Sequence, residues 1–543
     1  MRSTPKALPL AVAVLAALLA AATASAQQRP LPGLAPAAND ALTRALADGS
    51  LTEAEYALER ARSLFRLGRA RRQFGDVEPA GGRDATLLLR DLAARVTRLS
   101  RRERAQAERL LARPTDGAAD PQGQGYTVSE APPLCGADIC FHWVESSGDA
   151  PPGADGDPAT VPAQVLTTQA VFEDVWAAQT ALGYREPLSD IADDNNGGDE
   201  KLDVYLANVG ADGLFGYCAV DDPPALQFAV PVYCVVDDDY VELAAGTSHT
   251  PDELLAVTAA HELFHAVQAA YDFFDDGWLL EGTATNMEET LYPDIDDNVA
   301  FLSFSPLTKP EYPLDRAGFG DSEYGAWIFW RHLEENAYDG DPAIVRRVWE
   351  RAAAGLPADP DDYSLRAVAN VLRADGNRLA DEFARFGVAN RRRAYADRRL
   401  YPRAPTHGFF RVGPVNPVSG PHVRRLQHLT TKYFTFRPRR HVSPTARLKV
   451  AVDVHVHGGR ATLVVYYRDG RVRVRGFSYT ATGTGARRVA FGRGVVSRVD
   501  LVLSNGSSRT RCWRDLDRPP FFSCFGVPRD DARAFSFRAR LRD

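Results

Sequence analysis

Residues 250–289 constrain the fold more than any other stretch, because their pattern predicts two neighbouring helices around one cluster of polar side chains. His261 and His265 are four positions apart, so on a helix they point to the same side and can both offer a nitrogen to one metal ion. Glu262 projects beside them, where a carboxylate can take a proton from a metal-bound water. The stretch therefore predicts part of a metal site with a base next to it.

The start of the first helix and a third metal ligand are also indicated. Thr250 suits the N-cap, and Glu253, three positions on, completes a capping box. Glu281 lies sixteen positions after His265, beyond a polar turn, so a second helix can return its carboxylate to the two histidines. Two imidazoles and one carboxylate leave one coordination position for water, which is the geometry of a catalytic zinc site.

These motifs resemble those of the gluzincin metallopeptidases, the thermolysin-like and aminopeptidase N-like enzymes, in which HExxH is followed by a downstream glutamate. WLLEGTA at residues 278–284 is similar to the WLNEGFA-like segment of the aminopeptidases. HELFHAVQ, WLLEGTA and YGAWIFW are also similar to segments of secreted bacterial metalloproteases of myxobacterial type. The chain departs from thermolysin in a shorter gap before Glu281 and in Thr285, where thermolysin-like enzymes carry an aspartate.

The resemblance implies an α+β zincin-like catalytic domain with an all-α lower half. Zinc would be held by His261, His265 and Glu281, with Glu262 as general base acting on a protein or peptide substrate. Tyr324 is the candidate for a phenol that hydrogen-bonds the oxyanion, as a downstream tyrosine does in the aminopeptidases. Tyr312 and His332 are rival candidates for this role, and the alternative for Tyr324 is an aromatic side chain that only packs between helices.

The first 26 residues predict export. They contain two basic residues, an apolar run and a small-x-small pattern before Gln27, which is typical of a secretory signal peptide. We therefore expect a secreted protein, extracellular or periplasmic, with no membrane span. Export favours disulfides, and proximity pairs the six cysteines as Cys135 with Cys140, Cys218 with Cys234, and Cys512 with Cys524.

Three further regions follow the signal peptide. Residues 27–125 have helical patterning and end in a polar break, which indicates either a pro-region that shields the active site until removal or a permanent N-terminal helical domain. Residues 126–416 contain the strands and helices of the predicted catalytic domain. Residues 417–543 alternate with period two, which predicts a β-sandwich that binds a surface or polymer, or stabilises the protein.

An acidic, glycine-containing turn at residues 193–200 suggests a second metal. Asp193, Asn195 and Asp199 offer clustered oxygen ligands, which calcium prefers, although the spacing is not that of an EF-hand. The alternative is a solvated turn.

The net charge of −7 does not indicate a nucleic-acid partner, but acidic residues cluster between 187 and 300 while the last 150 residues are arginine-rich. The leading hypothesis is a secreted zinc endopeptidase. An exported binding or cell-surface protein on the same scaffold, and a zinc hydrolase of a non-peptide bond, are the alternatives.

Overall fold

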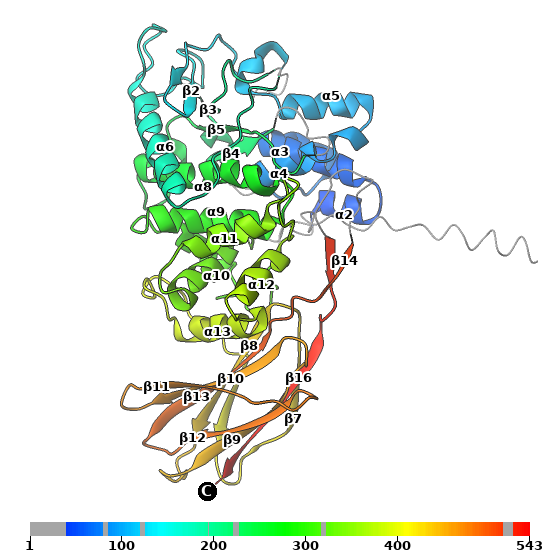
Figure 1. The fold of residues 1–543 in the computed structure, drawn as a ribbon, viewed down its shortest axis with the longest axis vertical. Coiled ribbons are helices and arrows are strands. Elements are labelled where there is room, and N and C mark those ends of the chain that lie inside the picture. Colours follow the sequence, from blue (N-terminus) through cyan, green and yellow to red (C-terminus); the bar gives the residue numbers. More distant parts are fainter. Residues whose placement is uncertain are drawn as a thin grey trace, which may run out of the picture. The chain divides into compact units, whose positions relative to one another are not determined.

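The computed structural model describes residues 40–79, 85–119, 125–193, 195–220, 227–316, 322–513 and 525–542. Residues 32–543 form one structural unit. The predicted signal peptide at residues 1–26 lies outside the described ranges. The described part of the chain is a mixed α/β protein with several sheets, including a set of C-terminal strands (Figure 1).

The N-terminal region is helical, as its apolar spacing predicts. Two capping boxes start its longer helices, Thr52 with Glu55 and Ser100 with Glu103, so that backbone groups of the first turn are satisfied by side chains. The elements are α2 (Ala41–Ala47), α3 (Glu53–Phe74), α4 (Ala85–Ala93), η1 (Val96–Arg98), α5 (Arg101–Leu110) and η2 (Pro114–Ala119).

A five-stranded mixed sheet follows, in the order β1-β2-β3-β5-β4. Strands β2, β3 and β5 run parallel, whereas the edge strands β1 and β4 are antiparallel to their neighbours. Every residue of β3 and β5 is buried, as parallel strands covered on both faces require. The elements are β1 (Leu134–Cys135), β2 (Ile139–His142), α6 (Ala163–Ala181), β3 (Leu202–Ala207), η3 (Gly210–Asp212), β4 (Gly216–Ala219), β5 (Tyr233–Asp237) and α7 (Val241–Ala244).

Two long helices pack beside this sheet. Helix α8 (Pro251–Asp272) contacts β4, β5 and α6, and α9 (Gly277–Leu291) lies against α8 (Figure 1). A large apolar core joins α8 and α9 to the helices that follow. These are η4 (Asp297–Ser303), η5 (Tyr324–Ala326), α10 (Trp327–His332), the π-helical turn η6 (Leu333–Ala337), α11 (Ala343–Ala352), α12 (Leu365–Ala374) and α13 (Leu379–Arg392).

Nine of the C-terminal strands form two sheets around a common apolar core, in the orders β11-β10-β13-β8-β6 and β12-β9-β16-β7, and β14 and β15 pair in a separate two-stranded sheet. In β9, Leu448, Val450 and Val452 are buried while the flanking Arg447 and Asp453 are exposed, which is the alternation that the sequence predicts. The strands are β6 (Gly408–Val412), β7 (Val418–Leu426), β8 (Thr430–Pro438), β9 (Arg447–Asp453), β10 (Gly459–Tyr467), β11 (Val472–Gly476), β12 (Thr484–Ala490), β13 (Val496–Asn505), β14 (Thr510–Trp513), β15 (Phe525–Pro528) and β16 (Arg533–Arg542).

The first strand of this region begins before residue 417, where the period-two pattern was expected to start. Strand β6 pairs in parallel with β8 through Gly408 and Phe434 and the residues that follow them. Its partner β8 is separated from it in the sequence by β7, so no local pattern reveals the strand.

Two of the three predicted disulfides are confirmed, Cys135 with Cys140 and Cys218 with Cys234. The third pairing involves Cys524, which lies outside the described residues. None of the helices in the described ranges has the length and apolar character that a bilayer crossing requires.

Removing the Cys218–Cys234 disulfide should lower the free energy of unfolding by about 3 kcal/mol, because the bond closes a loop with a sequence separation of 16 in the unfolded chain. The double serine variant of Cys135 and Cys140 is the matched control. Its separation of 5 predicts a smaller loss, of about 2 kcal/mol. Urea unfolding of both variants under non-reducing conditions measures the difference, and a reversed order would contradict the prediction.

Candidate metal centre

Helix α8 carries the two histidines and starts as the sequence predicts. The Thr250 backbone N–H donates to the Glu253 carboxylate at 2.7 Å, and the Glu253 N–H donates to the Thr250 hydroxyl at 3.2 Å. This capping box fixes the helix start. About three turns further along, His261 and His265 lie on one side of the helix with their ring centroids 4.7 Å apart.

Glu281 on α9 meets both histidines. Its Oε2 lies 3.1 Å from His261 Nε2 and 3.5 Å from His265 Nε2. The three groups each offer a ligand atom within 4.8 Å of the others. The structure therefore brings together the three predicted ligands, and none of them is more than 4% exposed.

The second nitrogen of each histidine is held by a side chain that sequence reasoning gave no role. Glu288 Oε1 lies 2.7 Å from His261 Nδ1, and Gln268 Oε1 lies 2.7 Å from His265 Nδ1. The Gln268 amide in turn donates to the Leu280 carbonyl at 2.9 Å. These contacts turn both Nε2 atoms toward Glu281, as outer partners of metal-binding histidines do.

Helical spacing could have revealed both of these partners. Gln268 is three positions after His265, and Glu288 is seven after Glu281, so each lies on the same helix face as a predicted ligand. A glutamine and a glutamate on buried helix faces are unusual enough to suggest a polar contact. At Thr285, where thermolysin-like enzymes carry an aspartate, the hydroxyl forms no hydrogen bond with a described residue.

The residues present fit a divalent cation. His265 Nε2 and Glu281 Oε1 are buried and form no hydrogen bond within the described part of the chain. Burial lowers the pKa of His261, but hydrogen bonds with Glu281 and Glu288 outweigh it and raise this pKa to about 10. The site thus stabilises positive charge, and a divalent cation can replace the histidine proton there. Two imidazoles and a carboxylate are a donor set that suits zinc.

Helix α4 lies directly against the predicted base. The Thr86 hydroxyl donates to Glu262 Oε2 at 3.1 Å and accepts a hydrogen bond from the Cys218 N–H of β4 at 2.9 Å. Burial raises the pKa of Glu262, whose side chain is 0% exposed. The cavity between α4, β4 and α8 has a volume of about 20 Å³, which is room for about one water. A peptide therefore has no access to Glu262 in this conformation.

Arg90 on helix α4 forms hydrogen bonds to the turn between α8 and α9. Its guanidinium donates to the backbone carbonyls of Asp275 at 2.7 Å and Phe273 at 3.3 Å. Arg90 is buried, so these charge-assisted hydrogen bonds form away from bulk water. Helix α4 is thus held at two points, by Thr86 on Glu262 near its start and by Arg90 on the turn between α8 and α9.

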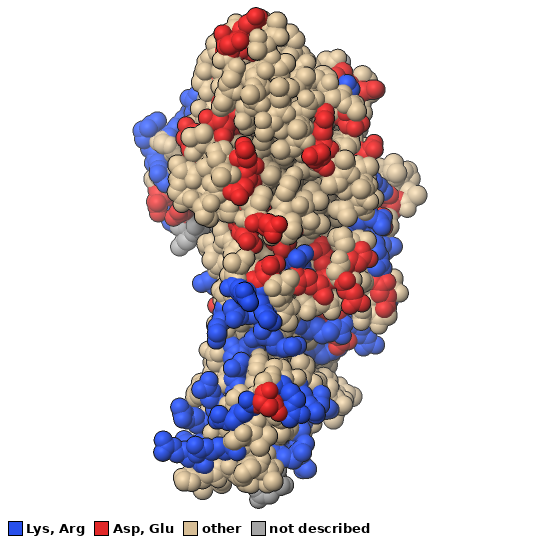
Figure 2. Space-filling view, turned by 90° about the vertical axis from the view of Figure 1, so that its left-hand side faces the viewer, with Lys and Arg blue, Asp and Glu red and all other residues tan. Residues whose placement is uncertain are grey.

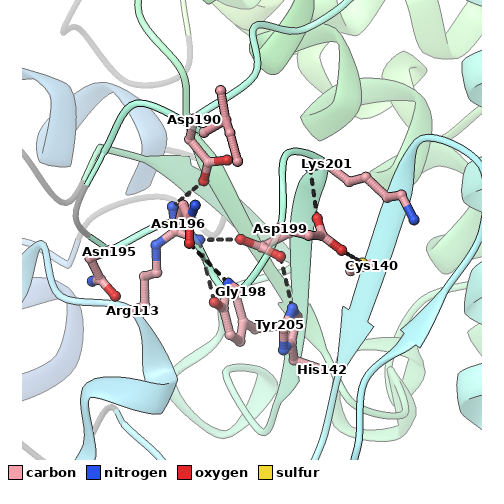
Figure 3. Close-up of polar contacts among 12 residues, drawn as sticks. Arg113, Cys140, His142, Asp190, Asn195, Asn196, Gly198, Asp199, Lys201 and Tyr205 are labelled. Carbon is pink, nitrogen blue, oxygen red and sulfur yellow. Dashed lines mark hydrogen bonds and ion pairs between the residues drawn. The ribbon is translucent and has the colours of Figure 1, made fainter.

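A second buried arginine fastens the end of the N-terminal region. Arg113 forms ion pairs with Asp190, at 2.6 Å, and with Asp203, and His142 Nε2 lies 2.8 Å from Asp203 Oδ1 (Figure 3). Burial raises the pKa of Asp190 to about 6, although Arg113 opposes that shift. Asp203 lies on β3, so this network joins the N-terminal region to the centre of the mixed sheet.

Tyr324 lies beside the metal ligands, as predicted. Its ring is stacked on the His261 ring, with centroids 6.0 Å apart, and on the Phe301 ring at 4.9 Å. It is 1% exposed. His332, another polar side chain on the same stretch, is instead paired with Glu382 at 2.9 Å. The role of Tyr324 as an oxyanion donor stays a prediction.

The three candidate calcium ligands have different partners. Asn195 donates to Asp116 at 3.1 Å, whereas Asp199 accepts from the Lys201 N–H at 2.8 Å and lies beside Cys140 (Figure 3). The Asp193 N–H donates to the Asp190 carbonyl in a backbone turn. The cation that lies among the acidic groups here is the Arg113 guanidinium, so calcium at Asp193, Asn195 and Asp199 stays a prediction.

Replacing Glu288 with glutamine should weaken zinc binding by about 10- to 100-fold, because the His261 ring loses its charged partner. Competition with a chromogenic chelator measures the affinity. Glu289→Gln is the matched control, since this neighbouring glutamate accepts a hydrogen bond from Asn298 at 2.8 Å rather than from a histidine. Equal weakening in both variants would contradict the role of Glu288.

No protein-family model and no curated protein matches the chain. Among solved structures, the pre-peptidase C-terminal domain of a collagenase from Bacillus anthracis is 8% identical with a TM-score of 0.15, and the match covers 26% of this chain and 100% of that one. A family GH115 4-O-methyl-alpha-glucuronidase with specificity for decorated arabinogalactans is 8% identical with a TM-score of 0.13, covering 67% of this chain and 54% of that one. At these scores neither likeness bears on the fold or the function.

Proposed function

We propose that the chain is a secreted zinc endopeptidase with a zincin-like catalytic domain, held inactive by its N-terminal helical region. The observation that carries the proposal is the convergence of His261, His265 and Glu281, with Glu262 beside them on the same helix. The antiparallel edge strand β4 next to α8 supports the likeness to gluzincins.

Each residue of the site has a role in this reaction. Zinc bound there would polarise the substrate carbonyl and lower the pKa of a water molecule. Glu262 accepts a proton from that water and passes it to the nitrogen of the leaving amine. Glu288 and Gln268 fix the orientation of the imidazole rings of His261 and His265 through their Nδ1 atoms. The proposed role of Tyr324, whose ring is stacked on His261, is to donate to the developing oxyanion.

The contacts of α4 support the pro-region interpretation of residues 27–125 over a permanent domain. Thr86 donates a hydrogen bond to Oε2 of Glu262, one of the two carboxylate oxygens of the proposed base, and the carboxylate is buried beneath helix α4. The four residues of the proposed site are between 0% and 4% exposed. A catalytic centre that stays this closed turns over no substrate, so α4 has to leave for activity.

The test is digestion of an unfolded, carboxymethylated protein by material from which residues 1–125 have been removed. We expect internal cleavage, loss of cleavage with 1,10-phenanthroline, and recovery when zinc is added back. Cleavage that persists without metal would contradict the proposal. Failure to cleave any protein, with zinc bound, would favour the exported binding protein, and hydrolysis of esters alone would favour the non-peptide hydrolase.

A further inference from the structure

The C-terminal strands carry a charge opposite to that of the rest of the chain. Residues 408–543 contain 27 Lys and Arg against 8 Asp and Glu, a net charge of +19 in a chain whose total is −7. Four of the eight acids form ion pairs, because Asp469, Asp500, Asp530 and Asp531 pair with arginine or histidine side chains. Figure 2 shows the Lys and Arg side chains gathered over these strands.

One sheet face collects basic side chains. Along β9 and β16 the residues Leu448, Val450, Phe535 and Phe537 point into the core, so the alternate residues form the outer face of the sheet β12-β9-β16-β7. None of the basic residues on this face forms an ion pair with a described residue. They are Arg425 on β7, Arg447 and Lys449 on β9, Arg488 on β12, and Arg538 and Arg540 on β16.

Three of these charges stand in one row across the strands. Lys449 pairs in register with Arg488 on one side and with Arg540 on the other. Like charges directly opposite each other destabilise a sheet. The row therefore opposes folding of this sheet unless an anion lies over it, and guanidinium groups bind carboxylates and sulfates through two parallel hydrogen bonds.

A hollow of about 670 Å³ lies on the same face, next to the row. Its outer-face lining combines the small residues Ala451, Ala486 and Ser536 with the charged residues Asp453 and Arg538. The hydroxyls of Ser478 and Thr480 also line it. A volume of this size is in the range of ligand sites, and its lining suits a hydroxylated ligand.

We propose that this face binds an acidic polysaccharide, with the row of basic groups on its carboxylates or sulfates and the hollow around its hydroxylated rings. Two aromatic residues line the hollow, Tyr479, whose hydroxyl is bonded to Ala461, and Phe537, which is buried in the core. At most one ring is therefore available for base stacking, which favours this partner over a nucleic acid. The hydroxyls of the hollow also distinguish it from a surface for fatty acyl chains. This inference does not depend on peptidase activity.

The experiment measures binding of the full chain to fluorescently labelled polygalacturonate and dextran sulfate, with uncharged dextran as the blank. We expect the triple variant Lys449→Ser, Arg488→Ser and Arg540→Ser to lose at least about tenfold in affinity, because it removes the charged row. The matched control is the triple serine variant of Arg471, Arg473 and Arg475 on and beside β11. It loses the same formal charge from the other sheet and should bind nearly as well as the parent.

Further readouts separate the outcomes. Thermal unfolding of the row variant should occur at or above the temperature of the parent, since like charges are removed. Equal losses in both triple variants would show general attraction to polyanions and would overturn the proposal, as would no binding to either polysaccharide. Stronger binding to duplex DNA or to vesicles containing phosphatidylglycerol, lost in the row variant, would assign the face to that polyanion instead.

Discussion

Cleavage within residues 114–125, followed by removal of the helical segment before the cut, should raise peptidase activity by about 100-fold or more. In the intact chain Thr86 is bonded to Glu262, which is 0% exposed, and the cavity lined by Thr86 and His265 has room for about one water. Activity then depends on transient opening of α4, and an opening free energy of about 3 kcal/mol would leave about 1% of molecules competent. A specific protease site inserted in the break, with activity measured before the cut and after gel filtration, gives the ratio.

A pair of arginine variants tests whether α4 itself is the barrier. Arg90→Gln removes the hydrogen bonds to the carbonyls of Phe273 and Asp275, so the uncut chain should gain activity. Arg104→Gln is the matched control, because Arg104 bonds only to the Thr97 carbonyl within the helical region. Full activity in the uncut parent would show that the helical region is a permanent domain that does not block the site.

Glu262→Gln should lower kcat by about 10³-fold or more, within the range that general acid–base catalysis contributes. The variant should keep zinc, because Glu262 is not among the three groups that converge as ligands. Turnover of a quenched peptide by the trimmed protein measures kcat, and elemental analysis measures the metal content. Unchanged turnover with zinc bound would show that another group is the base.

Two other glutamates separate the role of Glu262 from a general effect of the substitution. Glu281→Gln should lose metal as well as activity, since a charged ligand is gone. Glu253→Gln changes a carboxylate at the exposed start of the same helix and should keep both. The three variants together therefore distinguish a base, a ligand and a capping residue.

The local part of the site could be predicted from the sequence. His261 and His265 share a helix face because of their spacing, and the capping box at Thr250 marks where that helix starts. Glu281 was reached through the resemblance of its surrounding motif. Alternation in β9 likewise revealed which side chains face the core.

The contacts that close the site could not be predicted. Thr86 is 176 positions from Glu262, and Arg113 is 90 positions from Asp203. Such pairings depend on how the helices and the sheet pack. The periodicity of a segment predicts its own secondary structure and does not predict which distant residue it contacts. Strand β6 was missed for a similar reason, because its partner β8 is separated from it by β7.

The attachment of the N-terminal region at Arg113 has a kinetic consequence. While the chain is continuous, α4 would act at the effective concentration of a tethered group, and dilution would not change it. A cut after residue 113 leaves Arg113 between Asp190 and Asp203, so we expect the severed segment to remain bound and, under the proposed function, to act as an inhibitor in trans. From then on its occupancy falls with dilution. We therefore expect the freshly cut protein to show no peptidase activity at high protein concentration and to become active on dilution.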